Sequence, residues 1–98
     1  MTPEGNPDDP PLHSVRIPTV LRGYTAGASR VSAGGSTVDE VIRQLDSMFP
    51  GLRFRVVDEQ DRLRPHMKVF LGDEAVRDLD TRVEPGVEVT LMQALSGG

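Results

Sequence analysis

The sequence lacks cysteine and tryptophan, and it has few other aromatic residues and only two histidines. Without cysteine, disulfides, thiolate metal sites and cysteine nucleophiles are all excluded. His13 and His66 are too few for a histidine-based metal cluster, and we expect each to lie on a solvated loop. The scarcity of aromatic residues argues against base stacking, and the net charge of −4 argues against phosphate binding, so no nucleic-acid partner is expected.

Long apolar runs are also missing, and no secretory signal peptide is visible. We therefore expect a cytoplasmic protein without a membrane partner. At 98 residues the chain is one small domain, near the lower size at which one hydrophobic core stabilises a fold. Residues 1–12 contain four prolines and three acidic residues, which predicts a disordered extension before a folded domain over residues 13–92. Residues 93–98 are predicted to be a flexible tail.

Hydrophobic periodicity predicts four strands. The first is rich in β-branched residues, with Val15 and Ile17 on one face, and turn residues join it to a weaker second strand in a hairpin. The last strand places Val87, Val89 and Leu91 on one face. The predicted strands are residues 14–21, 29–33, 67–71 and 87–92.

One main helix is predicted between the second and third strands. Thr37 as N-cap with Glu40 three residues later forms a capping box, and Ser36 with Asp39 is the alternative boundary. Pro50-Gly51 ends the helix. Residues 52–57 are predicted as a short helical turn and residues 58–64 as a charged loop. The apolar stripe of the helix is Val38, Val41, Ile42, Leu45, Met48 and Phe49.

The order strand, strand, helix, strand, strand leaves one helix to cover one face of a mixed sheet. If the first and last strands lie side by side at the centre, the crossover through the helix makes them parallel. This is the ubiquitin-like β-grasp arrangement, an α+β fold. Residues 93–98 would then project roughly 20 Å when extended, at about 3.3 Å per residue.

The sequence ends in Gly97-Gly98. Two residues without Cβ can pass through a slot too narrow for any side chain and bring the terminal carboxylate to a buried catalytic centre. Taken alone, the pair is equally explained by a frayed end or a linker remnant. The residues that precede the pair decide between these interpretations.

Those residues resemble the ubiquitin-like sulfur carriers of the MoaD/ThiS superfamily, and within it the CysO branch that feeds a cysteine-synthase-type enzyme. The resemblance covers about residues 15–98 and depends on the order of its segments and on the free Gly-Gly end. Many relatives carry proline where Gln93 stands, so the root of the tail should be more mobile here. The matching segments are IPTVLR (17–22), GSTV (35–38), FPGL (49–52), DEAVR (73–77) and VTLMQALSGG (89–98).

The resemblance implies a protein cosubstrate with no cofactor of its own rather than an enzyme. A ubiquitin-activating-type enzyme would use ATP to adenylate the Gly98 carboxylate, and sulfide or a persulfide would displace AMP to leave a thiocarboxylate. The thiocarboxylate would donate sulfur to a biosynthetic enzyme that makes cysteine, a thiosugar or a similar metabolite. A metallo-hydrolase is a further candidate partner.

The same resemblance assigns roles to the tail. Ser96, Gly97 and Gly98 would thread the channel of the partner enzyme, while Ala94 and Leu95 would dock at its mouth. An apolar side chain beyond the last strand can anchor in a groove of the partner. The alternative for Leu95 is to fold back onto the edge of the sheet.

Alternation along the strands also predicts a docking patch on the face of the sheet away from the helix. Lys68, Phe70, Glu88, Thr90 and Met92 would point to that face. Phe70 and Met92 would be exposed apolar residues beside the tail, comparable in position to the hydrophobic face of ubiquitin. Single exposed apolar residues are also ordinary on protein surfaces.

Several alternatives stay open. The chain could be a protein modifier that Gly98 joins to lysines, the small subunit of a molybdopterin-synthase-type complex, or a plain interaction module. Asp58, Glu59 and Asp61 lack the spacing of a calcium loop, which favours a solvated acidic loop. Gly34-Gly35 lacks the lysine of a phosphate-binding loop, which favours a turn into the helix.

Overall fold

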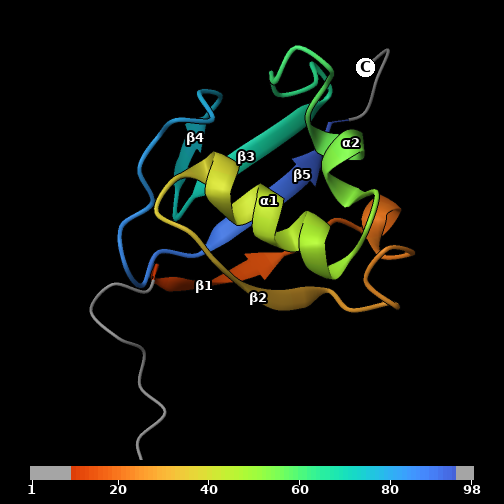
Figure 1. Cartoon of the computed structure of the whole chain (residues 1–98), viewed down its shortest axis with the longest axis horizontal. Coiled ribbons are helices and arrows are strands. Elements are labelled where there is room, and N and C mark those ends of the chain that lie inside the picture. Colours follow the sequence, from red (N-terminus) through yellow and green to blue (C-terminus); the bar gives the residue numbers. More distant parts are fainter. Residues whose placement is uncertain (1–9, 95–98) are drawn as a thin grey trace, which may run out of the picture.

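The computed structural model describes residues 10–94, and residues 1–9 and 95–98 lie outside the described part (Figure 1). The predicted division into an extension, a domain and a tail therefore stays a prediction. The elements in chain order are β1 (Leu12–Arg16), a 3-10 helix (Thr19–Leu21), β2 (Arg30–Gly34), α1 (Val38–Met48), α2 (Leu52–Val56), β3 (Met67–Leu71), β4 (Glu74–Val76) and β5 (Val89–Gln93).

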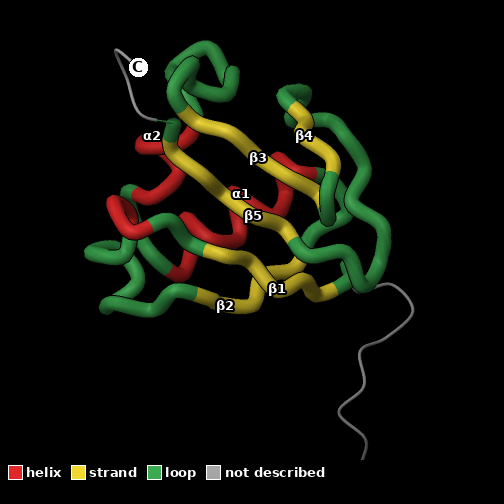
Figure 2. Tube along the Cα trace, turned by 180° about the vertical axis from the view of Figure 1, so that it is seen from behind, coloured by secondary structure: helices red, strands yellow, loops and turns green. Residues whose placement is uncertain are grey.

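The strands form one mixed sheet in the order β2-β1-β5-β3-β4. β1 and β5 are parallel, with Val15 opposite Val89, and the other neighbouring strands are antiparallel. α1 crosses one face of the sheet, while Figure 2 shows that no helix lies in front of the opposite face. The β-grasp prediction, with the first and last strands parallel at the centre, is confirmed.

The start of α1 follows the predicted capping pattern with one difference. The Thr37 hydroxyl accepts a hydrogen bond from the Glu40 N–H at 3.2 Å, as an N-cap should. The Glu40 carboxylate accepts its hydrogen bond from the Ser36 N–H at 2.7 Å, one residue earlier than a capping box requires. The preceding Gly35 is buried, and a Cβ there would lie 2.6 Å from the Val41 nitrogen. The predicted turn into the helix therefore begins at Gly35, while Gly34 is the last residue of β2.

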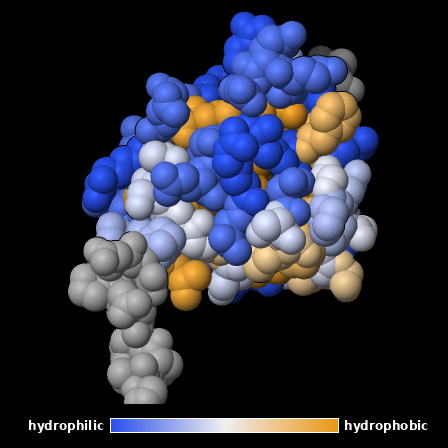
Figure 3. Space-filling view, viewed as in Figure 1, coloured by the Kyte–Doolittle hydropathy of each residue, from blue (hydrophilic) through white to orange (hydrophobic). Residues whose placement is uncertain are grey.

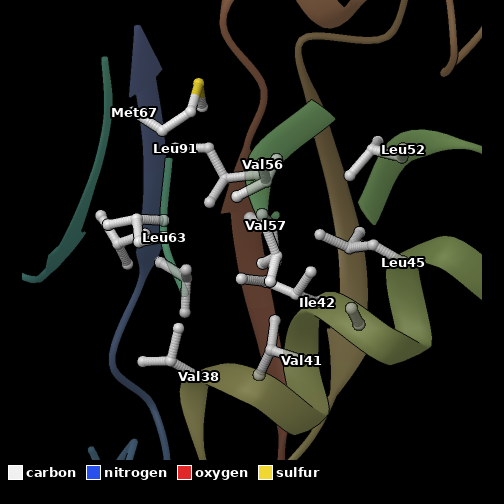
Figure 4. Close-up of a cluster of buried hydrophobic side chains, with 14 of the residues drawn as sticks. Val38, Val41, Ile42, Leu45, Leu52, Val56, Val57, Leu63, Met67 and Leu91 are labelled. Atoms are coloured by element: carbon white, nitrogen blue, oxygen red, sulfur yellow. The ribbon is translucent and has the colours of Figure 1, made fainter. Parts of the chain in front are cut away.

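The hydrophobic core lies between α1 and the sheet, and α2 closes one end of it (Figure 4). Fully burying each Val, Leu or Ile side chain contributes about 1.5–3 kcal/mol, so this cluster is the main source of stability. The predicted stripe of α1 is right for its first four members. Met48 is 40% exposed and Phe49 is only partly buried, because the helix ends where the sheet no longer lies beneath it. The labelled core residues are Val38, Val41, Ile42, Leu45, Leu52, Val56, Val57, Leu63, Met67 and Leu91.

Two elements differ from the prediction. The first strand ends at Arg16, before Pro18, and Thr19–Leu21 form a 3-10 helix that buries Leu21. Proline offers no N–H to a neighbouring strand, which explains why the ladder stops there. Glu74–Val76 form the short strand β4 against β3, which the sequence prediction lacked. The other strands and α2 agree with their predicted ranges within two residues.

His13 is not on a solvated loop as predicted, whereas His66 is exposed in a turn. The His13 side chain is 2% exposed, with Nδ1 at 3.0 Å from the Val87 carbonyl oxygen and Nε2 at 2.9 Å from that of Gly35. Buried carbonyl groups need hydrogen-bond partners, and these two lie on the segments that lead into β5 and α1. His13 therefore ties β1 to both segments.

Candidate functional site at the root of the C-terminal tail

The tail leaves the sheet from its central strand. In β5, Gln93 pairs with Met67 of β3, and the Ala94 N–H then donates to the His66 carbonyl at 2.8 Å. Gln93 is thus held in a strand by backbone pairing, and no proline is needed to keep it extended. Of the predicted tail, residue 93 is the last residue of β5 and Ala94 is held by a backbone hydrogen bond.

Four of the predicted site residues lie beyond this point. Leu95, Ser96, Gly97 and Gly98 are outside the described residues, so their predicted roles in docking, threading and sulfur carrying stay predictions. Figure 1 shows that the described chain ends beside α2, at the end of the sheet where β3 begins. The surroundings of Gln93 and Ala94 therefore define the candidate site.

The face of the sheet away from the helices carries the predicted docking residues. Met92 is 44% exposed and lies directly opposite the exposed Lys68. Phe70 lies between Thr90 and Ala75 of the neighbouring strands and is only partly exposed. The expectation of exposure is confirmed for Met92 and wrong for Phe70, because neighbouring strands on both sides cover an interior position of the sheet.

A groove of about 470 Å³ runs beside Met92 on one flank of the tail root. Val20 contributes to it from the 3-10 helix and is 58% exposed. The sequence prediction missed Val20 because it placed this residue in a strand. The lining residues are Arg16, Ile17, Pro18, Thr19, Val20, Arg22, Thr90, Leu91, Met92 and Gln93.

A second hollow of about 270 Å³ lies on the other flank of the tail root. Phe54 of α2 is 57% exposed there, and the Arg64 guanidinium lies 4.7 Å from the centre of its ring. Gln93 lines both hollows. We call the residues of this second hollow the Phe54 surface, and they are Phe54, Arg55, Glu59, Arg64, His66 and Gln93.

A third hollow, of about 550 Å³, shares no residue with either flank of the tail root. Of its charged lining residues, Asp39 binds Arg43 at 2.7 Å, while Arg53, which lies outside the lining, binds Asp39 at 3.3 Å and Asp61 at 3.1 Å. Burial raises the pKa of Asp39, but the hydrogen bonds from Arg43 and Arg53 outweigh it, and the pKa is lowered overall. The ion pairs of Asp39 and Arg53 thus connect the start of α1 to α2 and to the loop at Asp61.

The acidic loop after α2 is stabilised by hydrogen bonds between the Asp58 side chain and the backbone of the same loop. The Asp58 carboxylate accepts hydrogen bonds from the N–H groups of Arg62 and Gln60, and these bonds lower its pKa although desolvation opposes them. Within residues 10–94, no group of three histidine or acidic side chains could hold a metal ion. None of the helices formed by these residues has the length and apolar character needed to cross a membrane.

Comparison with known proteins gives consistent matches. The model of the ThiS family matches residues 15–98. The sulfur carrier protein CysO of Mycobacterium tuberculosis is 36% identical over 90 residues, which cover 87% of this chain and 97% of that protein. Two crystal structures are also similar: the BexX/CysO complex of Amycolatopsis orientalis (38% identity, TM-score 0.81, 87% of this chain and 98% of that chain) and SAMP1 of Haloferax volcanii (26% identity, TM-score 0.74, 89% and 99%).

Proposed function

The chain belongs to the ThiS family, and we propose that it is a sulfur carrier of the CysO type that bears its sulfur on the Gly98 carboxylate. The observation that carries the proposal is the family match, which extends through the C-terminal Gly-Gly. The similarity to CysO over nearly the whole length of that protein supports the same conclusion. The chain would act as a protein cosubstrate, and partner enzymes would carry out the catalysis.

The chemistry requires activation because a carboxylate is a poor electrophile. A carboxylate oxygen of Gly98 attacks the α-phosphorus of ATP on an activating enzyme, and pyrophosphate leaves. A sulfur nucleophile such as sulfide then attacks the carbonyl carbon of the acyl adenylate, the bond from that carbon to the phosphate oxygen breaks, and AMP leaves. The product is a thiocarboxylate whose sulfur can attack an electrophile in an acceptor enzyme.

The described residues present the tail for this chemistry. β5 is paired with β3 as far as Gln93, and the Ala94 N–H is bonded to the His66 carbonyl, so the backbone is held in place up to the residue before Leu95. Met92 and Val20 offer exposed apolar surface beside that point. Ala94 and Leu95 would dock at the channel mouth of the partner, and Gly97 would thread the channel. Phe70, being partly buried, would contribute little contact area.

The partner classes follow from the same chemistry. An adenylating enzyme is required for activation, and a biosynthetic enzyme is required to accept the sulfur. The BexX/CysO complex supports a partner of the second kind, because a protein 38% identical to this chain is bound there to another protein. A metallo-hydrolase stays a further candidate.

The test is intact mass spectrometry after incubation with ATP, sulfide and the adenylating enzyme encoded in the same genome. We expect one oxygen of the Gly98 carboxylate to be replaced by sulfur, with fragmentation placing the change at the last residue. Gly97→Val should fold normally and fail to receive or pass on sulfur, because a branched side chain does not fit a channel made for glycine. An unchanged mass for the wild-type chain would contradict the proposal.

A protein modifier is the second candidate, favoured by the similarity to SAMP1, a small archaeal modifier protein. In that case the acyl adenylate of Gly98 would react with a lysine amine rather than with sulfide. A ladder of covalent conjugates on denaturing gels, absent without ATP, would support this candidate. The thiocarboxylate and the ladder are separate readouts, so one experiment with both distinguishes the two functions.

A further inference from the structure

We propose that the Phe54 surface is a second docking site for the enzyme that adenylates Gly98, and that this enzyme meets it with an apolar pocket and carboxylates beside its channel mouth. The inference rests on the proposed function, because the tail fixes where that enzyme must lie. Adenylation is the first step and acts on the unmodified tail. The proposed function therefore requires the chain to bind the adenylating enzyme, whichever enzyme later accepts the sulfur.

Phe54 has the character of a binding anchor. α2 is only five residues long and buries Leu52 and Val56 in the core, which leaves Phe54 pointing away from it with 57% of its side chain exposed. Figure 3 shows apolar surface over α2, surrounded by hydrophilic residues. Aromatic side chains with this setting are the residue type that dominates binding energy at protein interfaces.

Arg64 holds the anchor in place. Its guanidinium lies 4.7 Å from the centre of the Phe54 ring, and its Nε donates to the Phe54 carbonyl at 2.7 Å. The stacked guanidinium restricts the ring before any partner arrives, so less conformational entropy is lost on binding. One face of the ring is covered by Arg64, and the rest is left for a pocket of the partner.

The position of the surface selects the partner. The Ala94 N–H donates to the carbonyl of His66, which lines the Phe54 surface, so Ala94 lies at the rim of that surface. Gln93 lines both the Phe54 surface and the groove beside Met92. An enzyme that takes in the tail from Ala94 onward must bring its channel mouth against both flanks. The flank at Met92 combines exposed apolar side chains with Arg16 and Arg22, while the flank at Phe54 combines an aromatic ring with Arg55 and Arg64.

The charged residues of the Phe54 surface indicate which side chains the partner should present to it. Arg55 is exposed, and among residues 10–94 neither Arg55 nor Arg64 forms an ion pair. Glu59 is the one acidic residue of the Phe54 surface, so its two arginines outnumber its acidic side chains, whereas the adjoining hollow on the other side of Phe54 is lined by Asp46, Asp58 and Asp61. Carboxylates of the partner would pair with the two arginines and would fix the orientation of the enzyme around the tail.

The test is the concentration dependence of thiocarboxylate formation by the full chain with ATP, sulfide and the adenylating enzyme. We expect Phe54→Ala and Arg55→Glu each to raise the KM for the carrier by about tenfold or more, with kcat nearly unchanged. The wild-type KM should also rise with salt. Two control variants should leave KM unchanged. Leu12→Ala truncates an exposed apolar side chain at the end of β1 far from Ala94, and Arg82→Glu reverses an exposed charge.

Thermal unfolding of each variant checks that its fold is intact, and Arg55→Glu decides the matter if Phe54→Ala is unstable. Equal KM values for Arg55→Glu and Arg82→Glu would overturn the docking site while leaving the proposed function standing. The docking site would also be overturned if Phe54→Ala and Arg55→Glu slowed only the later transfer of sulfur to the acceptor enzyme. A wild-type chain that gains no sulfur would instead remove the proposed function, and the docking site with it.

Discussion

Replacing Gly35 by alanine tests how the turn into α1 is packed. A Cβ at Gly35 would lie 2.6 Å from the Val41 nitrogen and 2.9 Å from the Glu40 carbonyl carbon, both backbone atoms that cannot rotate away. Ordinary contact begins at 3.4 Å, so the turn or the helix must move by about 0.8 Å, the difference between 3.4 and 2.6 Å. The movement also strains the contact between the Gly35 carbonyl and His13 Nε2, which are 2.9 Å apart.

The expected cost follows from these contacts. Overpacking in a close-packed region costs about 1–3 kcal/mol, and a weakened buried hydrogen bond adds about 1 kcal/mol. Alanine stiffens the unfolded chain relative to glycine and returns about 0.4–1 kcal/mol. The net destabilisation should therefore be about 2–3 kcal/mol, which lowers the melting temperature of a domain of this size by roughly 10–20 °C.

Gly34→Ala is the matched control. A Cβ at Gly34 meets its nearest neighbour, the Pro11 carbonyl oxygen, at 3.5 Å, which is ordinary contact. We expect the stability of this variant to stay within about 0.5 kcal/mol of wild type or to rise slightly. Urea unfolding followed by circular dichroism, with thermal melts as a second readout, compares the two variants. If Gly35→Ala were as stable as Gly34→Ala, the close packing of this turn against the helix would be refuted.

Three further predictions concern single side chains. His13→Ala removes the ring that contacts the buried Gly35 carbonyl and the part-buried Val87 carbonyl, and it should cost about 2–4 kcal/mol in urea unfolding; a loss under about 0.5 kcal/mol would contradict the bridging role. The lowered pKa of Asp39 means that its carboxylate adds stability that is present above its ordinary value of 3.8 and lost as the pH falls below it. Asp39→Asn should therefore flatten the loss of stability in acid, measured as urea midpoints across pH, and an unchanged slope would count against the ion pairs. Lys68 is the single lysine of the chain and is exposed. If the chain is a protein modifier, Lys68→Arg should therefore abolish conjugates in which one copy is joined to the lysine of another, as seen on denaturing gels. A ladder of self-linked conjugates that persists in this variant would mean that another residue accepts Gly98.

The elements that the sequence predicted well are those whose signals are local. The N-cap at Thr37, the apolar spacing that follows and the stop at Pro50-Gly51 all lie in α1 or within three residues of its ends, and the helix forms as expected. The alternation of Val89 and Leu91 places both in the core for the same reason. The parallel pairing of the first and last strands then follows from connectivity.

The features that the sequence prediction missed depend on contacts between distant segments. Nothing next to His13 in the sequence indicates that its side chain will be buried, with its ring nitrogens in contact with carbonyl groups 22 and 74 residues away. β4 is three residues long and mostly exposed, so it carries no periodic signal. Phe54 gave no signal for the site, because only the folded chain brings α2 to the end of β5.

The parallel register of β1 and β5 separates the two ends of the folded region. Because Val15 lies opposite Val89, Leu12 and Ala94 are eight residue steps apart along the strand direction, or roughly 26 Å at about 3.3 Å per step. A fluorophore, affinity tag or surface linkage attached ahead of Leu12 would thus project from the end of the sheet opposite the tail root. Under the proposed function, immobilised or labelled protein prepared in this way should keep Gly98 accessible to enzymes in solution, whereas any fusion after Gly98 would block the carboxylate proposed to carry the sulfur.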